Sequence, residues 1–450
     1  MGKRKTARDL AWDALARVLE GAEPSHEVMS ASLADPQAPQ EDRDRRFFVQ
    51  LFEGTLERLP ALDDALSRVC SRPLEKQKPV FRTGLRLAAY QILYLDSVPD
   101  RAAVSETLAG LERRKLGGLK NAANGILRAL SREKAGMTLP PREEDPVRHL
   151  SLAAAASPWL TEKLIEEYGY DAAQIALLSS LGPAPVTARA VRGTAKEAVE
   201  RLRAQGAQAQ EVIGQPGALW IRPEGDLSAM GPVADGSVIV QDLSSQLAGY
   251  AADIQPGMTV IDVCAAPGGK SLHAAQLLGG SGKVIAMDIS DRRLERLREN
   301  AARTGLPLTV RVHDGREAAP DLAGCADVVL CDVPCSGTGV IRRKKEIKYR
   351  VTPEQIDSLI PLQRQIVSAA VHYLKPGGRL VYSTCSILPE EDDGQRSWIL
   401  ENLPVSPLSL KGLLPPAAED GLRENGTFLR LPGESPGDGF YIAVFRKEQA

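Results

Sequence analysis

The sequence has few cysteines, no long apolar run and almost no net charge, and each absence excludes a class of protein. Its 450 residues include 6 cysteines and 5 histidines. No two cysteines form a CxxC pair and no two histidines an HxxH pair, so we expect neither a disulfide framework nor a metal site. No apolar run approaches the roughly 18 residues that cross a membrane, and no apolar stretch follows the basic N-terminal residues as in a secretory signal. The pattern favours a reduced, cytoplasmic setting.

The net charge of −2 argues against a uniformly basic nucleic-acid binder. Two basic clusters stand out locally, Arg113–Lys115 and Arg342–Lys345. For the first, an ordinary solvated helix face is favoured over contact with phosphate. The chain is too long for one ordinary core, so two or three domains are expected.

The N-terminal part is expected to be all-helical. Between residues 5 and 134 apolar side chains recur at helical spacing, and short linkers with Pro, Gly or Asp separate the amphipathic runs. In the first run these apolar positions are Leu10, Ala11, Leu15, Val18 and Leu19. The stretch 139–146 is dense in proline and charge and is typical of a linker. We therefore expect a helical bundle over residues 1–138.

The rest of the chain is expected to be α/β. Residues 146–235 mix helical and strand-like segments and predict a small α/β subdomain. Over residues 236–448 β-branched runs alternate with helical runs, which predicts a doubly wound, mostly parallel, Rossmann-like sheet. Within it, segment 404–438 is rich in Pro and Gly and is expected to be loop. The fold class is thus multidomain, and ligands should bind where the parallel strands end.

A loop of small residues follows the first predicted strand of this sheet. After Asp262 and Val263 it reads Cys264, Ala265, Ala266, Pro267, Gly268, Gly269, Lys270, and a helix follows. Small residues let a ligand approach the backbone, and a helix N-terminus offers free N–H groups. The loop is neither a GxGxxG fingerprint nor a Walker loop. A zwitterionic amino-acid moiety is therefore a better ligand for it than a pyrophosphate.

Acids end the next three strands as well: Asp288, Asp314 and Asp332. Asp288 lies about 20 residues after Gly268, where a carboxylate suits a ribose diol, and Asp314 could face a purine edge. Each acid could instead cap a helix, but four acids at consecutive strand ends, Asp262 included, favour a ligand site. An adenosine with an amino-acid tail is S-adenosylmethionine; the alternative, a nicotinamide dinucleotide, would favour a full glycine fingerprint.

Two cysteines stand at strand ends of the same sheet. Cys335 lies in Asp-Val-Pro-Cys-Ser-Gly-Thr-Gly and Cys385 in Ser-Thr-Cys-Ser, whereas the other four cysteines, which lie in apolar runs, suit small buried hydrophobes. Methylation of pyrimidine carbon 5 requires a thiolate that adds to carbon 6, an acid near ring nitrogen 3, and a group that assists elimination. Asp332, Cys335 and Cys385 supply these types, and a cation such as Lys270 would favour a thiolate. The base must leave any stack to reach them.

These blocks resemble the signature motifs of the bacterial RsmB (Sun) ribosomal RNA cytosine-5 methyltransferases, in the wider NOL/NSUN group. Further matching blocks are Val240-Gln241-Asp242, Ser245-Gln246, Gly339–Lys344 and Asp438-Gly439-Phe440. Residues 5–134 resemble the NusB-like RNA-binding domain, notably at 85–96 and 124–128. The resemblance covers nearly the whole chain and implies a class I methyltransferase fold for the C-terminal part.

The resemblance also implies residue roles. Cys385 would be the nucleophile, Cys335 would assist product release, and Asp332 would lie near the base. S-adenosylmethionine would be held by residues 264–270, Asp288, Arg293, Asp314 and Asp332. The substrate would be one cytosine in 16S ribosomal RNA. The chain departs from the family at Arg189-Ala190-Val191, where an Arg-Val-Asn-like run is usual, which puts RNA contacts there in doubt.

Two rival functions remain open at this stage. One is a binding factor whose enzyme half is vestigial, although the intact cysteine and glycine motifs argue against it. The other is a methyltransferase of protein or adenine, although adenine chemistry needs no thiol. We expect a monomer that binds ribosomal RNA and neither metal nor membrane, with Arg342, Arg343, Lys344 and Lys345 on RNA phosphates.

Overall fold

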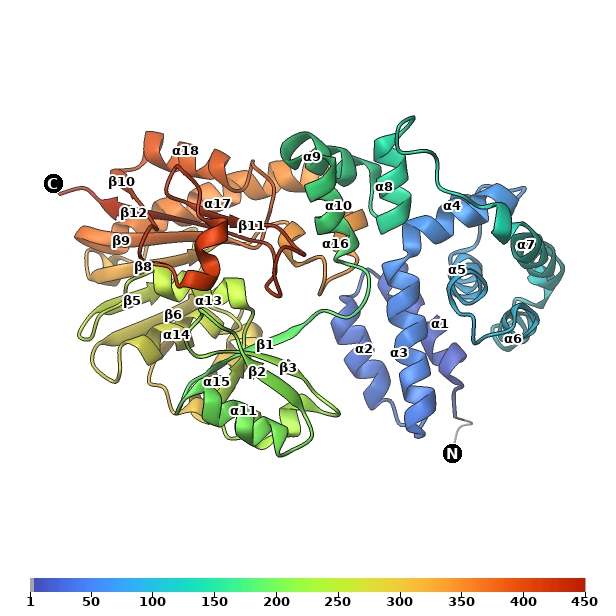
Figure 1. Cartoon of the computed structure of the whole chain (residues 1–450), viewed down its shortest axis with the longest axis horizontal. Coiled ribbons are helices and arrows are strands. Elements are labelled where there is room, and N and C mark those ends of the chain that lie inside the picture. The colour runs from blue at the N-terminus through green and yellow to red at the C-terminus, as the bar shows by residue number, and fades with distance from the viewer. Residues whose placement is uncertain (1–3, 450) are drawn as a thin grey trace. The chain divides into compact units, whose positions relative to one another are not determined.

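The computed structural model describes residues 4–449, which form two compact units (Figure 1). The first unit contains the chain up to Leu181 and, separately, Lys344–Arg350. The second contains Gly182–Arg343 and the chain from Val351 on. The domain boundaries expected from the sequence, 1–138, 146–235 and 236–448, stay a prediction. Nothing in the sequence pattern indicated that Lys344–Arg350 packs with the helical unit.

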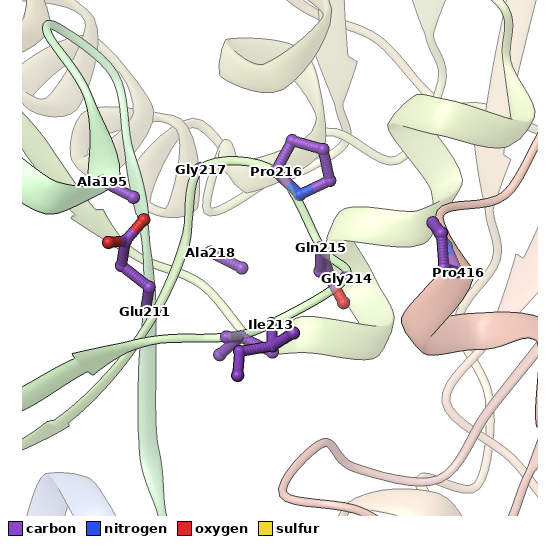
Figure 2. A pocket seen from close by; sticks show the side chains of 10 residues that line it. Ala195, Glu211, Ile213, Gly214, Gln215, Pro216, Gly217, Ala218 and Pro416 are labelled. Carbon is purple, nitrogen blue, oxygen red and sulfur yellow. The ribbon is translucent and has the colours of Figure 1, made fainter.

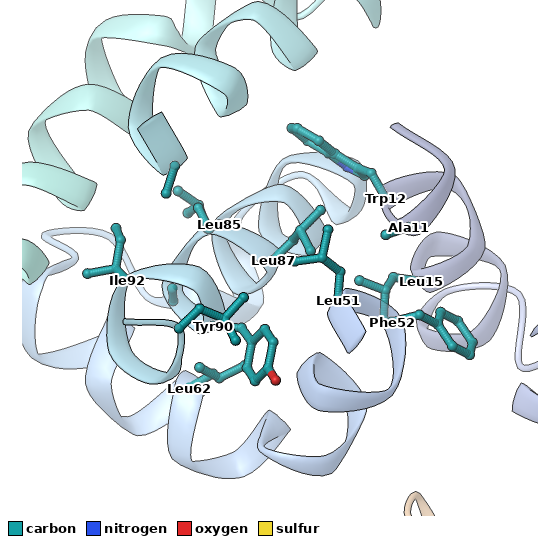
Figure 3. Packing of buried hydrophobic residues seen from close by; sticks show 14 of the residues in the cluster. Ala11, Trp12, Leu15, Leu51, Phe52, Leu62, Leu85, Leu87, Tyr90 and Ile92 are labelled. Atoms are coloured by element: carbon teal, nitrogen blue, oxygen red, sulfur yellow. The ribbon is translucent and has the colours of Figure 1, made fainter. Parts of the chain in front are cut away.

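The first unit is entirely helical. Its helices are α1 (Ala7–Leu19), α2 (Ser25–Ala34), α3 (Asp42–Glu57), α4 (Leu59–Val69), α5 (Pro79–Tyr94), α6 (Asp100–Arg113), α7 (Lys120–Glu133), α8 (Pro146–Ala154), α9 (Pro158–Tyr168), α10 (Tyr170–Leu178) and α16 (Ile347–Arg350). Figure 3 shows apolar side chains from α1, α3, α4 and α5 meeting in one core. The helical prediction for the N-terminal part is confirmed.

Trp12 packs in this core and contacts Arg114 of the basic cluster Arg113–Lys115. A methyl group added at Gly84 would lie 2.0 Å from the Trp12 ring, so only glycine allows α5 to approach it. Arg114 lies over the same ring, 4.4 Å from its centroid, and pairs with Asp9 and Asp13 at 2.9 and 2.6 Å. Arg114 thus stabilises the fold, and a solvated helix face describes Arg113 and Lys115, which are exposed, rather than Arg114.

The second unit contains two sheets. The smaller is antiparallel, in the order β2-β3-β1-β4, and packs helix α11 (Ala195–Arg203). Its strands are β1 (Val186–Ala190), β2 (Gln208–Glu211), β3 (Ala218–Arg222) and β4 (Val238–Val240). The larger sheet has eight strands in the order β10-β12-β9-β8-β5-β6-β7, with β11 paired to β12.

The larger sheet is parallel from β9 to β7. On the other side of β9, strand β12 pairs antiparallel with it. Its strands are β5 (Thr259–Asp262), β6 (Lys283–Asp288), β7 (Thr309–Val312), β8 (Ala326–Asp332), β9 (Leu374–Thr384), β10 (Val405–Leu408), β11 (Phe428–Arg430) and β12 (Phe440–Lys447). Because β10 and β11 lie within 404–438, the expectation of an all-loop segment there is wrong: the pairing partner, β12, comes later in the chain.

Helices cover both faces of this sheet, which confirms the doubly wound fold. Ile261 packs on the face covered by α17 (Pro353–Tyr373) and α18 (Asp393–Asn402), while its neighbour Val260 packs on the face of α13 (Leu243–Ala251) and α14 (Gly269–Leu277). The chain order reverses between β5 and β8, and ligands of open α/β sheets bind at such a switch point. No helix of the described residues is long and apolar enough to cross a membrane.

Candidate active site

The loop between β5 and α14 is held in a single shape by its own acids and glycines. Asp262 is buried and accepts a hydrogen bond of 2.6 Å from Ser271 Oγ in the first turn of α14. Burial raises the pKa of Asp262 to about 6. Gly268 adopts a φ of 113°, and a methyl group there would lie 2.9 Å from Leu297. The loop therefore requires glycine, and its backbone leads directly into the free N–H groups of α14.

Asp288, at the end of β6, lies against this loop. Its carboxylate accepts hydrogen bonds from the backbone N–H groups of Ala266 and Ser290, at 3.2 and 3.0 Å. Arg293, in α15 (Asp291–Thr304), lies 3.4 Å from Asp288 and donates to the Ala266 carbonyl at 2.9 Å. Each carboxylate oxygen has two lone pairs, so Asp288 can still accept from a ribose diol. These donors and acceptors fit an amino-acid tail and a ribose.

Asp314 lies two residues beyond β7 and is ionised across the neutral range. It accepts hydrogen bonds from the guanidinium group and the backbone N–H of Arg316, both at 3.0 Å. These bonds lower the pKa of Asp314 to about 2. The side-chain hydrogen bonds of Asp314 in the described residues are all with Arg316, two residues later, and its side chain is partly exposed. No hydrogen bond between the described side chains of Asp314 and Asp288 links the two acids.

Asp332, at the end of β8, is paired with the lysine of the loop. Lys270 Nζ lies 2.8 Å from Asp332 Oδ2, and Ser383 Oγ donates to Asp332 Oδ1 at 2.8 Å. Burial favours the neutral amine, but the charges of Asp332 and Asp262 outweigh it and raise the pKa of Lys270. Lys270 Nζ also lies 5.1 Å from the centre of the Phe440 ring. The site thus holds a fixed cation beside a carboxylate.

The two strand-end cysteines meet. Strands β8 and β9 are parallel neighbours with Asp332 opposite Ser383, so the loops that follow them share one edge of the sheet. Cys335 Sγ lies 3.2 Å from Cys385 Sγ. The hydrogen bond to Cys385, together with burial, raises the pKa of the Cys335 thiol well above its usual value. This distance allows the Cys335 thiol to donate a hydrogen bond to the Cys385 sulfur.

The other four cysteines lie in apolar clusters: Cys70, Cys264, Cys325 and Cys331. Burial raises the pKa of Cys70, Cys264 and Cys331. Thiols in such surroundings resist ionisation and behave as small hydrophobic side chains.

A polar network behind the two thiols was missed by sequence reasoning. Ser336 and Ser386, the residues that follow the two cysteines, have their hydroxyl oxygens 3.2 Å apart. Glu391 accepts hydrogen bonds from the backbone N–H of Ser336 at 2.9 Å and from Gln363 Nε2 at 2.9 Å. The only signal in the sequence was the acidic run 390–393 after the Cys385 loop, which is equally typical of a solvated surface.

The family-like motifs converge beside these loops. Gly339 and Gly439 stack so closely that a methyl group on Gly339 would lie 2.3 Å from the Gly439 carbonyl oxygen. Gly339 N–H also donates to the Cys385 carbonyl at 2.8 Å. Asp242 accepts from the Asp438 backbone N–H at 3.1 Å. Segments far apart in sequence thus fix the Cys385 backbone.

The predicted basic run is divided in its contacts. Arg343 is clamped between two carboxylates, Asp242 at 2.9 Å and Asp438, and burial raises the pKa of Asp438 to about 7. Arg342 donates to the Ser435 carbonyl at 3.1 Å. In the helical unit, Lys345 pairs with Glu57 and Lys344 is exposed. Of the four cations, Lys344 is the one that faces solvent without a paired acid in the described part of the chain.

A separate hollow lies away from these residues. It has a volume of about 520 Å³ and is lined by the loop between β2 and β3, with Ile213 and Pro416 at its mouth (Figure 2). None of the residues expected at the active site lines it.

Comparison with known proteins gives two family matches. Residues 250–446 match the model for 16S rRNA methyltransferase RsmB/F, and residues 5–132 match the NusB family. The chain is 32% identical to a probable ribosomal RNA small subunit methyltransferase B of Bacillus subtilis, over 99% of this chain and 100% of that protein. It is 34% identical to ribosomal RNA small subunit methyltransferase B of Sodalis glossinidius, over 98% of each.

Among solved structures the chain is similar along its whole length to the protein PH0851. The TM-score is 0.83 and the identity 24%, over 99% of this chain and 100% of that one. A methyltransferase homolog protein from Pyrococcus horikoshii matches with a TM-score of 0.56 and 27% identity, over 67% of this chain and 99% of that one. The first likeness concerns the fold alone.

Proposed function

The chain belongs to the RsmB/F family of 16S rRNA methyltransferases, which use S-adenosylmethionine, and on that premise we propose that it methylates carbon 5 of one cytosine in small-subunit ribosomal RNA. The observation that carries the proposal is the 3.2 Å approach of Cys335 Sγ to Cys385 Sγ beside the Lys270–Asp332 pair. Methylation of an exocyclic amine or a ribose hydroxyl would need neither sulfur.

We propose that the cofactor lies at the carboxyl ends of β5 and β6. Residues Cys264, Ala265, Ala266, Pro267, Gly268, Gly269 and Lys270 would form the loop against it. Asp288 would accept from the ribose hydroxyls, Arg293 would hold the loop through Ala266, and Asp314 and Asp332 would bound the site. When bound, the cofactor supplies an electrophilic methyl group.

In this proposal Cys385 is the nucleophile and Cys335 acts later. The Cys385 thiolate adds to carbon 6 of the cytosine. Asp332, a carboxylate paired with Lys270 in the free enzyme, takes up a proton when the base binds and donates it to ring nitrogen 3, where negative charge develops. Carbon 5, now electron-rich, is methylated. Water that reaches the site takes the carbon-5 proton, the electron pair of that C–H bond restores the double bond, and the bond between carbon 6 and Cys385 breaks to give back the thiolate. The Cys335 thiol assists by donating a hydrogen bond to the departing Cys385 sulfur, 3.2 Å away. The raised pKa of the Cys335 thiol supports the assignment, because a sulfur that stays protonated can donate a hydrogen bond to the Cys385 sulfur.

The RNA would be held by the helical unit and by the basic run after the Cys335 loop. Lys344 is the cation of that run best suited to phosphate because it is exposed, whereas Arg343 is held by Asp242 and Asp438. Arg342 and Lys345 would act beside it. The site requires a flipped or single-stranded base.

Nucleoside analysis tests the reaction. Unmethylated 16S rRNA, naked or in partly assembled particles, is incubated with the enzyme and isotopically labelled S-adenosylmethionine, and digested nucleosides are separated by mass spectrometry. We expect the label in 5-methylcytidine. Label in a methylated adenosine or in protein, or no transfer to any substrate, would contradict the proposal.

A further inference from the structure

The side chain of Glu391 is fully buried beneath the two thiol loops, with no exposed surface. Its hydrogen-bond donors among the described residues are neutral: the Ser336 backbone, the Ser336 hydroxyl and the Gln363 amide. Burial of a carboxylate is unfavourable unless hydrogen bonds compensate it. A buried acid whose donors belong to an active-site loop therefore points to a role in shaping that loop.

The Glu391 carboxylate accepts two hydrogen bonds from Ser336, the residue that follows Cys335. Ser336 donates through its backbone N–H to Glu391 Oε1 at 2.9 Å and through its hydroxyl to Glu391 Oε2 at 2.5 Å. Two bonds from one residue to one carboxylate fix both the position and the rotation of the Ser336 backbone. Since Cys335 is covalently joined to that backbone, its Cα–Cβ direction is fixed as well.

The Ser336 hydroxyl also contacts the loop that contains Cys385. Ser386 Oγ lies 3.2 Å from both Ser336 Oγ and Thr338 Oγ1, and accepts from the Leu388 backbone N–H at 3.0 Å. Glu391 itself follows this loop, and its carbonyl accepts from the Tyr382 hydroxyl at 2.7 Å. The Glu391 carboxylate thus holds Ser336 after β8, while the Ser336 hydroxyl and the Glu391 carbonyl link that loop to the end of β9.

We propose that Glu391 is a positioning residue that keeps the Cys335 thiol against Cys385, so that Cys335 can act when the product is released. The inference rests on the proposed function. Glu391 touches neither the sulfurs nor the cofactor loop in its described contacts, so it acts through Ser336. Displacement of a catalytic group by about an ångström slows its step by roughly a hundredfold.

The test measures adduct formation and adduct release separately. Full-length enzyme, substrate RNA and S-adenosylmethionine are mixed in single turnover, and covalent protein–RNA species are followed on denaturing gels. Cys335→Ala is the reference and should accumulate an adduct. We expect Glu391→Ala to accumulate it too, with release slowed roughly 10- to 100-fold and formation changed less than about threefold. In the Cys335→Ala background, Glu391→Ala should add almost nothing.

Two milder variants serve as controls. Glu391→Gln keeps an acceptor for the Ser336 N–H and should release faster than Glu391→Ala. Ser336→Ala removes the hydroxyl contacts with Glu391, Ser386 and Thr338 and keeps the backbone bond to Glu391. It should also retain adduct, and it carries the test if Glu391→Ala does not fold. The proposal would be overturned if Glu391→Ala slowed adduct formation and adduct release equally. It would also be overturned if Glu391→Ala slowed release further in the Cys335→Ala background. No adduct with Cys335→Ala itself would instead contradict the proposed function.

Discussion

Lys270 and Asp332 form an ion pair of 2.8 Å that joins the loop between β5 and α14 to the end of β8, three residues before Cys335. Lys270 is largely buried, and its pKa is raised because the carboxylates outweigh the cost of burial. The pair places a permanent positive charge near the strand end from which Cys385 follows. A thiolate formed there is stabilised by that charge, and Cys385 is among the groups that raise the pKa of Lys270.

Removal of the Asp332 charge should slow formation of the adduct. Asp332→Asn keeps an acceptor for Ser383 but cannot hold a proton for ring nitrogen 3 and leaves Lys270 without its nearest partner. We expect single-turnover adduct formation to fall by about 10²- to 10⁴-fold, the range of general acid–base effects, while the variant still binds S-adenosylmethionine in calorimetry. A rate within about threefold of the parent would contradict a role for Asp332 at the base.

Two neighbouring cations should give opposite phenotypes. Arg343→Ala leaves the buried carboxylate of Asp438 and the half-buried one of Asp242 without their cation, so we expect the free energy of unfolding to fall by about 3 kcal/mol. Lys344→Glu should leave stability unchanged and weaken RNA binding, with a smaller dependence of log affinity on log salt. Chemical denaturation and filter binding at several salt concentrations measure the two effects. Unchanged affinity for Lys344→Glu would reject the phosphate contact.

Lys348 should make the stability of the helical unit depend on pH. Its ammonium group is buried and donates to the Ala154 carbonyl at 2.7 Å and to Ser180 Oγ at 3.0 Å, and burial lowers its pKa to about 7. Between pH 7 and the ordinary lysine value the unfolded chain binds more protons than the folded one. The free energy of unfolding should therefore rise with pH across this window, by at most about 1.4 kcal/mol per pH unit.

Lys348→Met supplies the comparison for this slope. The variant lacks the titrating group, so its stability should not show the extra rise, while all other titrations are shared. Urea denaturation of both proteins at about pH 7.5 and about pH 9.5 measures the difference. Parallel pH profiles for the two proteins would mean that Lys348 is not buried in its neutral form.

The sequence predicted the elements whose signals are local. Each of these signals lies within a short stretch of sequence: the β-branched run of β5, the glycine loop after it, and an acid at the end of each strand. The sheet forms as they indicate. Helix α2 has the weakest signal in the helical part, because only Val28 and Ser32 of its residues are buried and it has almost no apolar stripe. Strand β10 was missed because its register, Val405 opposite Lys447, is set by a distant partner.

The candidate site shows the same division. Cys335, Cys385 and the acids could be named because each stands at the end of a predicted strand of one sheet. The burial of Glu391 could not be predicted, because acids in an acidic run are usually solvated. Here Gln363 of α17, which is distant in the sequence, donates a hydrogen bond to its carboxylate. The attachment of Lys344–Arg350 to the helical unit likewise depends on contacts such as that of Arg350 with the Val18 carbonyl, at 2.7 Å.

The most direct test of the account is the identity of the sulfur that bonds to the RNA. Cys335→Ala and Cys385→Ala are each incubated with substrate RNA and S-adenosylmethionine, digested with protease and nuclease, and examined by mass spectrometry. The account predicts that Cys335→Ala yields a peptide with a methylated cytidine on Cys385, and that Cys385→Ala yields no adduct. An adduct on Cys335 in the Cys385→Ala protein, with none in Cys335→Ala, would contradict it.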